Sequence, residues 1–271
     1  MECALKVVFE TRFTFFGKSG WRSEASRDPA GLFDEDRLKA RFSLFENITL
    51  PSLVAQTDPD FKQIVLSSTR MPNKWKTHLS ELCHDTLGAD RCLVHFNNWG
   101  HAGRIFRRLV RKMAGDQPDE VTAQVVLDDD DAVSMNFVEL CRRESLNAAA
   151  YFTSPEDYSF LSFPRGYSMK IAENSLHFIT RQVDFTNLGL TLVAPTKTRR
   201  NPFLTSHRKI GQRRPSRVIS DLSGCYIRTV HQNNDSRGMH DDDGPEVPLE
   251  QVQQNFPAIG AFHQKVTAGQ I

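Results

Sequence analysis

Four consecutive carboxylates, Asp128 to Asp131, have the type and spacing that most clearly indicate chemistry in this chain. They follow the apolar run Val125-Val126-Leu127 directly, with no Gly, Pro or Ser between. Such a run predicts a buried parallel strand, and ligands bind at the carboxyl edge of open α/β sheets. Adjacent carboxylates raise one another's pKa unless a cation neutralises them, so we expect Mg²⁺ or Mn²⁺ together with a nucleotide's phosphates. A solvated acidic loop is the alternative interpretation.

Composition and charge limit the class of protein. The chain has 271 residues, a formal net charge of +1, 39% hydrophobic and 25% charged residues. The length allows one large domain or two small ones. The near-zero net charge gives no overall positive electrostatic potential of the kind that attracts nucleic acid. Five cysteines without any CxxC spacing argue against a disulfide framework or a zinc site and favour a reducing compartment. No signal peptide and no apolar run near the roughly 20 residues of a membrane span are recognisable, so we expect a soluble, cytoplasmic protein.

Strand and helix patterns alternate over roughly the first 140 residues. Their hydrophobic spacing predicts strands over 4–9, 61–67 and 92–96 and in the run before Asp128, and helices over 36–49, 76–87, 103–113 and 135–144. Alternation of this kind predicts an α/β, doubly wound sheet. Short candidate strands over 167–171, 176–180 and 189–193 predict a smaller antiparallel region in the second half, with some strands added to the main sheet.

A basic stretch, residues 196–217, carries eight Lys or Arg residues and neither Asp nor Glu. It has three interpretations. It could be a mobile lid that closes over a diphosphate, or a peripheral contact with anionic lipid at the inner membrane face. The third is a solvated loop without a specific role.

An α/β sheet whose mid-chain strand ends in Asp-x-Asp resembles the nucleotide-sugar glycosyltransferases of the GT-A fold. Further motifs make the chain similar, over most of its length, to the bacterial putative rhamnosyltransferase family. These motifs are Thr11-Arg12-Phe13, Arg41-Phe42-x-Leu44-Phe45-Glu46, Thr49-Leu50-Pro51-Ser52-Leu53, Gln56-Thr57-Asp58-x-Asp60-Phe61, Val126-Leu127-Asp128-Asp129-Asp130-Asp131-Ala132, Asn201-Pro202-Phe203, Ser206-His207 and Val230-His231-Gln232-x-Asn234-Asp235-Ser236.

This resemblance implies a GT-A-like doubly wound, mixed, mainly parallel sheet with a smaller antiparallel acceptor-side region. Residues 1–140 would form the nucleotide-sugar-binding half, and residues 141–271 the acceptor-side half with the basic stretch and a C-terminal tail. The implied activity is a metal-dependent hexosyltransferase that moves a sugar, rhamnose by the family's name, from a nucleotide-sugar donor. The implied acceptor is a bacterial glycan or a lipid-linked glycan precursor.

The resemblance also implies roles for the acids. Asp128 and Asp130 would form the Asp-x-Asp pair, in which Asp128 touches the donor or the metal and Asp130 binds a Mn²⁺ or Mg²⁺ ion. That ion would bridge the donor's phosphates and act as a Lewis acid. Asp129 would point to the opposite side of the strand, as a structural or donor-side partner, and Asp131 would reach the sugar or the metal.

Further donor and metal contacts are expected at the ends of the first two strands and in the second half. The donor would be contacted by Thr11, Arg12, Ser67, Ser68 and Arg208. Arg12 suits an anion best, because its planar fork donates two parallel hydrogen bonds. His207 and His231 are expected either as metal ligands or as ordinary packed or surface histidines.

A general base is needed if the transfer inverts the sugar, because the acceptor hydroxyl must lose a proton. Glu156 and Asp157 are the preferred candidates, and Glu173 and Asp184 are the others.

Two other functions fit parts of the sequence. A haloacid-dehalogenase-like phosphatase or phosphotransferase also places Asp-x-Asp after a strand, with Asp128 as nucleophile and Asp130 as acid/base. That site normally follows the first strand, which disfavours it here. A non-catalytic module that binds nucleotide or glycan is the other alternative, and turnover would distinguish it from an enzyme.

Overall fold

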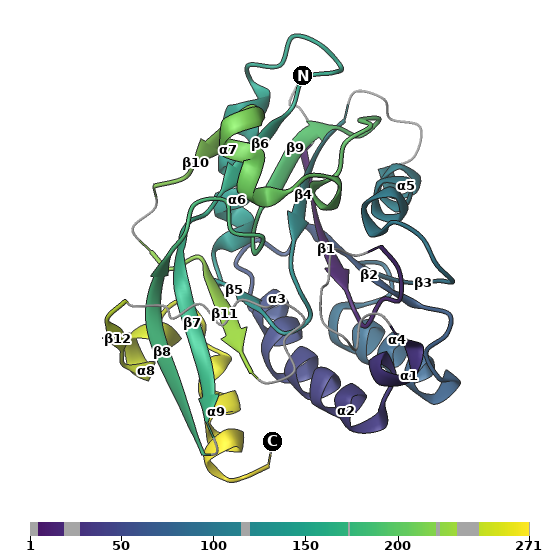
Figure 1. The fold of residues 1–271 in the computed structure, drawn as a ribbon. Coiled ribbons are helices and arrows are strands. Elements are labelled where there is room, and N and C mark those ends of the chain that lie inside the picture. Colours follow the sequence, from purple (N-terminus) through teal and green to yellow (C-terminus); the bar gives the residue numbers. More distant parts are fainter. Residues whose placement is uncertain are drawn as a thin grey trace.

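The computed structural model describes residues 5–18, 28–114, 120–172, 174–220, 223–231 and 244–270. A seven-stranded sheet forms its centre, in the order β10-β6-β9-β4-β1-β2-β3 (Figure 1). The strands are β1 (Leu5–Arg12), β2 (Phe61–Ser68), β3 (Cys92–Asn97), β4 (Val121–Val126), β6 (Ser159–Ser162), β9 (Thr191–Pro195) and β10 (Ser216–Val218). Strands β1 to β4 are mutually parallel where they pair, whereas β9 runs antiparallel to both β4 and β6.

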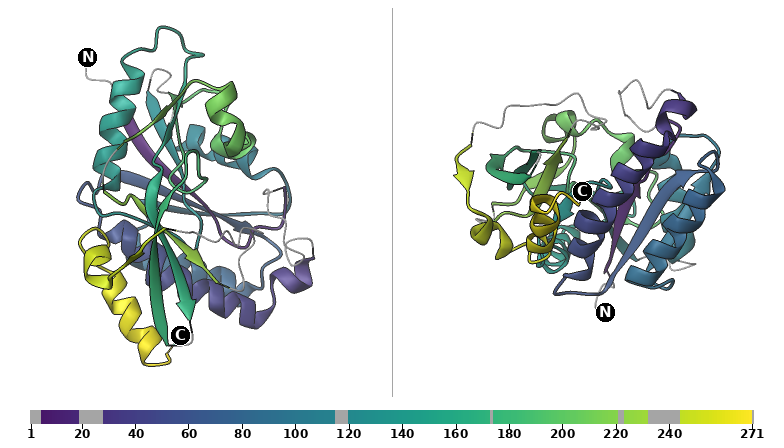
Figure 2. Two further views of the ribbon diagram at one scale, coloured as in Figure 1. Left: turned by 60° about the vertical axis from the view of Figure 1, so that its left-hand side comes forward. Right: turned by 90° about the horizontal axis from the view of Figure 1, so that it is seen from below.

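Helices cover both faces of this sheet, as the doubly wound prediction requires (Figure 2). Val7 and Phe9 of β1 point into a core with α2, α3, α4 and α6, while Val8 packs on the other side against α5. The helices are α1 (Pro29–Leu32), α2 (Glu35–Leu44), α3 (Leu50–Val54), α4 (Asn73–Leu87), α5 (Ala102–Ala114) and α6 (Phe137–Ala149). Alternation of side chains between the two faces of β1 therefore serves two separate cores.

Helix α2 does not end where an ordinary helix would. Leu38 and Phe42 form its apolar stripe, and a π-helical turn, Phe45–Thr49, connects it to α3 without a break. Pro51 lies in the first turn of α3 and has no amide hydrogen to donate. The helix predicted over 36–49 thus continues into α3 through a wider helical turn, a feature common near functional sites.

A second, five-stranded sheet has the order β12-β8-β7-β11-β5. Its strands are β5 (Ala132–Val133), β7 (Arg165–Ala172), β8 (Ser175–Gln182), β11 (Tyr226–Val230) and β12 (Glu246–Val247). The long β7–β8 hairpin extends away from the main sheet, and α8 (Leu249–Gln253) and α9 (Ile259–Thr267) pack against it (Figure 1). The predicted antiparallel region is present, although β7 and β11 pair in parallel.

The two halves of the chain share both sheets. β6, β9 and β10 come from beyond residue 140 and complete the main sheet, whereas β5 comes from before it and joins the second sheet. The α/β class with a mainly parallel central sheet is confirmed. In the described part of the chain, every helix is too short or too polar to cross a bilayer.

The basic stretch is folded against the sheet. After β9 it forms two 3₁₀ turns, Pro202–Leu204 and His207–Lys209, the short helix α7 (Ile210–Arg213) and strand β10. Ile210 is buried against the main sheet. Most of the residues expected in a mobile lid are therefore held by regular structure and by a core contact.

Candidate active site

The four acids occupy the turn that links β4 to β5, at the carboxyl edge of the parallel strands. The hydroxyl of Thr11 donates to the carbonyl of Leu127 at 2.7 Å, which fixes the end of β4 to β1. Within the turn, the amide of Asp131 donates to the carbonyl of Asp128 at 3.4 Å. The acids are thus held by the fold at the predicted edge, and they are not a solvated loop.

Arg12 and Asp128 form an ion pair at this edge. Nη2 of Arg12 lies 2.6 Å from Oδ1 of Asp128, and the Arg12 side chain is only 5% exposed. Its guanidinium also lies over the ring of Phe203, 4.5 Å from the centroid. The Asp128 side chain is 25% exposed, so it is the acid of the four that is most open to solvent.

Arg41 of α2 joins the next two acids. Its Nε and Nη2 donate to the two oxygens of Asp129, with the Nε contact at 3.2 Å, and its Nη1 donates to Oδ2 of Asp130 at 3.0 Å. Asp129 has no exposed surface. This geometry agrees with a structural role for Asp129 and leaves it no surface for a donor contact.

His231 reaches the same carboxylate from the end of β11, with Nε2 at 3.0 Å from Oδ2 of Asp130. Burial opposes the charge of Asp130, yet Arg41 and His231 hold its pKa at about 2. Burial raises the pKa of Asp129 to about 7, against the pull of Arg41. Burial and the neighbouring carboxylates raise the pKa of Asp131 well above its ordinary range, and Asp131 accepts from the Thr229 amide at 2.9 Å.

Asp130 supplies the carboxylate that a hard divalent cation prefers, and the imidazole of His231 lies beside it. Four carboxyl groups face two guanidinium groups here, and a cation bound among them would favour ionisation of Asp129 and Asp131, whose pKa values are raised in its absence. Across the ranges that the structure describes, no set of three or more His, Cys, Asp or Glu side chains converges as a complete metal site. Mg²⁺ commonly takes one or two protein carboxylates and completes its shell with water and phosphates, which these residues fit.

Three of the predicted donor contacts lie inside the sheet. Thr11, Ser67 and Ser68 are fully buried. Thr11 also accepts from the Gln63 amide at 2.8 Å, and the Ser68 hydroxyl accepts from the Arg70 amide at 3.2 Å. Their hydroxyl groups are used to close turns and to join strands, and this corrects the expectation that they line the donor pocket.

The predicted residues of the basic stretch divide into two groups. His207 donates from Nδ1 to the Phe185 carbonyl at 2.8 Å, an assignment that leaves Nε2 as an acceptor. Burial lowers its pKa, while the hydrogen bond to the Phe185 carbonyl and the charge of Asp128 act in the opposite direction. Arg208, by contrast, is exposed. The predicted membrane contact of this stretch stays a prediction.

The preferred base candidates are not brought to this edge. Ser159 is level with Val193 and Ala123 across the sheet, and β6 runs in the same direction as β4. Glu156 and Asp157 precede β6, so they lie at the opposite edge, about 15 Å or more from the acid turn at a rise of about 3.3 Å per residue.

Asp157 has a local role in its own loop. It accepts from the amides of Thr153 and Ser154 at 2.7 and 2.9 Å, which lowers its pKa. Its hydrogen bonds close a loop on the side of the sheet away from the acids, which corrects its choice as the base. Glu173 and the motif residues 232–236 lie outside the described residues.

Among the base candidates that the structure describes, Asp184 is the one in a loop at the edge of the acid turn. It is exposed in the loop between β8 and β9. Gly189 of the same loop donates to the carbonyl of Val126, the last residue of β4, at 2.9 Å. The next residue after Asp184, Phe185, is the one whose carbonyl accepts from His207.

Sequence reasoning assigned no role to a buried group beneath this edge. Glu10 of β1 has no exposed surface, and both of its carboxyl oxygens accept from the side-chain amide of Asn201 at 2.9 Å. The same amide nitrogen lies 3.1 Å from Oε1 of Gln124 on β4. Burial raises the pKa of Glu10 from 4.5 to about 8. A Glu in the middle of an apolar strand was the available sequence signal.

Replacing Glu10 with glutamine is expected to flatten the dependence of stability on pH. The folded protein keeps a proton on Glu10 that the unfolded chain loses above about pH 4.5. The contribution of Glu10 to stability is therefore complete below that pH, and it decreases as the pH rises until the folded protein also loses the proton, at about pH 8. Between these pH values the free energy of unfolding contributed by Glu10 falls by about 1.4 kcal/mol per pH unit. The total loss is on the order of 3 kcal/mol by pH 7. Denaturant unfolding from pH 5 to 8 measures it. Glu250→Gln, at an exposed site on α8, should keep the wild-type slope, and equal slopes for Glu10→Gln and wild type would contradict the assignment.

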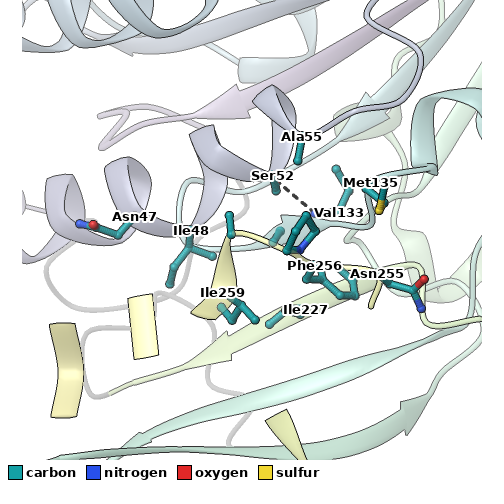
Figure 3. Close-up of a pocket in the computed structure, with 13 residues that line it drawn as sticks. Asn47, Ile48, Ser52, Ala55, Val133, Met135, Ile227, Asn255, Phe256 and Ile259 are labelled. Atoms are coloured by element: carbon teal, nitrogen blue, oxygen red, sulfur yellow. Dashed lines mark hydrogen bonds between the residues drawn. The ribbon is translucent and has the colours of Figure 1, made fainter. Parts of the chain in front are cut away.

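A small apolar recess lies behind the acid turn, where α3 and β5 meet the C-terminal helices (Figure 3). Ile48, Val133 and Ile259 are among its lining residues, and Val133 donates to the hydroxyl of Ser52 at 3.4 Å. It carries no titratable side chain and therefore has no evident part in the chemistry of the acids.

Solved structures with remote similarity include TarS from S. aureus, with a TM-score of 0.40, 11% identity and coverage of 83% of this chain and 37% of that one. Residues 1–349 of the same protein give a TM-score of 0.40 and 12% identity, with coverage of 98% and 70%. A putative nucleotide-diphospho-sugar transferase from Desulfovibrio desulfuricans G20 has a TM-score of 0.37 and 8% identity, and the match covers 94% of this chain and 97% of that one. This chain thus spans little more than a third of the longer TarS chain. No curated protein matches it.

A family model covers far more of the chain than any single motif does. The model described as "Putative rhamnosyl transferase" matches residues 6–242, which include the acid turn, Arg12, Arg41 and His231. The chain belongs to this family of glycosyltransferases.

Proposed function

We propose that this protein transfers a sugar, rhamnose by its family's description, from a nucleotide-sugar donor to a glycan or lipid-linked glycan acceptor. One observation carries the proposal. Arg12, Arg41 and His231, from three separate elements, converge on the acids at the carboxyl edge of β4. This edge is where α/β sheets bind their ligands, and the mixture of cations and carboxylates suits a diphosphate with a divalent ion.

Each side chain has a definite task in this proposal. Arg12 presents a planar donor group beside the partly exposed Asp128, where it can meet the diphosphate as well as the carboxylate. Asp130 and His231 would hold Mn²⁺ or Mg²⁺, which when bound supplies Lewis-acid stabilisation of the departing nucleoside diphosphate. Arg41, on α2, holds the carboxylates of Asp129 and Asp130 in place. Preorganised charge of this kind stabilises a leaving group without reorganisation during the reaction.

Release of nucleoside diphosphate tests the function. The purified protein is incubated with Mn²⁺ and a panel of nucleotide sugars, and the diphosphate product is measured with and without a chelator. Release from one donor that the chelator suppresses supports the metal-dependent transferase. Donor and metal binding without release would favour the non-catalytic module, whereas phosphate release from a monoester would favour the phosphatase, which family membership already disfavours.

Asp184 is the residue that we propose as general base. Asp184→Asn is expected to slow sugar transfer to the acceptor about a hundredfold while donor hydrolysis by water falls much less, because only the acceptor hydroxyl depends on this carboxylate. Product analysis with and without acceptor separates the two reactions. Asp157→Asn, in the loop at the opposite edge, is the matched control and should transfer sugar normally. Equal losses in both reactions would assign Asp184 to donor binding instead.

A further inference from the structure

Three buried polar side chains join the chain after β9 to the centre of the sheet. Asn201, Glu10 and Gln124 are each no more than 1% exposed. The amide nitrogen of Asn201 contacts Glu10 and Gln124, and its Oδ1 accepts from the Phe203 amide at 3.0 Å. We call these three residues the buried clasp. Fully satisfied polar networks in a core select one arrangement of the elements that they connect, because any other arrangement leaves polar groups unpaired.

Neighbouring contacts hold the same segment from the side of α5. Arg107 donates to the carbonyl of Arg199 at 2.8 Å, and Arg111 donates to the carbonyl of Thr198 at 2.8 Å. A Cβ atom on Gly103 of α5 would lie 2.8 Å from Oδ1 of Asn201, so the helix approaches the clasp as closely as a glycine permits. The backbone of residues 198–203 is therefore fixed along its length.

Fixing this backbone also fixes the position of Phe203, two residues after Asn201. Its ring stacks on that of Phe106, with centroids 5.1 Å apart, and the guanidinium of Arg12 lies over it, 4.5 Å from its centroid. Arg12 in turn donates to Asp128. Contacts therefore run without a gap from the buried clasp through Phe203 and Arg12 to the most exposed acid of the active site.

We propose that Asn201 is a positioning residue that acts through Phe203 and Arg12 to set the affinity for the donor. The proposal rests on the proposed function in so far as Arg12 meets the donor's diphosphate. Asn201 itself touches no reacting atom. Its effect is to keep an aromatic surface against one face of the guanidinium, so that Arg12 is already oriented when the donor arrives.

A double-mutant cycle between Asn201→Leu and Arg12→Met tests this mechanism. Leucine has nearly the shape of asparagine but breaks the clasp. We expect Asn201→Leu to raise the donor KM about tenfold with a smaller change in kcat, and to add little in the Arg12→Met background. Independent, additive effects of the two replacements on KM would overturn the proposal, because Asn201 would then act by a route that does not include Arg12.

The pair Glu10→Gln and Asn201→Asp guards against a variant that merely folds poorly. Together they restore an amide–carboxyl contact between positions 10 and 201 with donor and acceptor exchanged, but not the contact with Gln124 Oε1, so partial recovery is expected. The carboxylate introduced by Asn201→Asp can still accept from the Phe203 amide. Recovery of the donor KM in this double variant, relative to Asn201→Asp alone, supports the clasp as the cause. No recovery in a variant with wild-type Tm would overturn it.

A measurement without donor separates this proposal from the proposed function. The Tm values of Asn201→Leu, Arg12→Met and their combination form the same cycle in the free protein. If the clasp orients Arg12, the decrease in Tm of the double variant should be smaller than the sum of the two single decreases. A decrease equal to that sum would refute the positioning role. If the losses are coupled but the wild-type protein releases no diphosphate from any donor, the positioning stands and the proposed function fails.

Discussion

Arg41→Met is expected to destabilise the fold by about 3–5 kcal/mol, because removal of one partner leaves buried carboxylates without a counter-charge. Arg41 is 3% exposed and binds both Asp129 and Asp130, whose side chains are 0% and 11% exposed. Methionine replaces much of the aliphatic volume, so the loss reports charge and hydrogen bonding more than packing. In a chain of this size, that loss corresponds to a decrease in Tm of about 10 °C, measurable by thermal unfolding.

Two companion variants make the result specific. Arg41→Lys keeps the charge but lacks the planar fork, and it should lose part of the stability because one ammonium group cannot reproduce three directed contacts. Lys39→Met removes a cation that is 58% exposed on the same helix, and it should cost less than about 1 kcal/mol. Similar losses for Arg41→Met and Lys39→Met would show that the buried ion pairs contribute little.

Asp130→Asn is expected to reduce nucleoside-diphosphate release about a hundredfold or more while the protein remains folded. The replacement is nearly isosteric, and it removes the negative charge to which both Arg41 and His231 bind. A divalent ion bound there, as proposed, would lose its carboxylate ligand, so the activity that remains should respond much less to Mn²⁺. Titration of Mn²⁺ with the donor identified from the panel measures both effects.

Asp131→Asn tests whether Asp130 or Asp131 is the metal ligand. The pKa of Asp131 is raised well above its ordinary range, and an asparagine oxygen can still accept from the Thr229 amide, so a smaller loss is expected. Asp85→Asn, at an exposed position of α4, is the surface control. If Asp131→Asn abolishes Mn²⁺-dependent release and Asp130→Asn does not, the metal role belongs to Asp131.

The acid turn was predictable because four carboxylates that directly follow a buried apolar strand cannot move away from the end of that strand. Parallel topology then fixes the edge at which they lie. Arg41 belongs to one of the family's motifs, yet its role is hard to predict, because a single Arg in a helix usually faces solvent. The available signal is its spacing: three residues after Leu38 and four before Phe45, it lies on the apolar stripe of α2.

The base candidates failed for a topological reason. Sequence pattern did not reveal β6, only four residues long, and its direction decides to which edge Glu156 and Asp157 belong. The buried hydroxyl groups of Ser67 and Ser68 show a related limit, since the end of a strand predicts nearness to an edge but not which side chains remain open there. The sequence places Asn201 in a motif without indicating its contacts, because its partner Glu10 is 191 positions away along the chain.

The exchange of strands between the two halves has a consequence for how the protein is made. When a ribosome has released only the first 140 residues, β4 has its β1 partner but lacks β9, which is still to be synthesised. An apolar strand with one unpaired edge is a template for association with other chains. A nascent chain of this protein must therefore protect that edge until residues 191–195 emerge, and a gene truncated near residue 140 should yield aggregates in place of a folded N-terminal half.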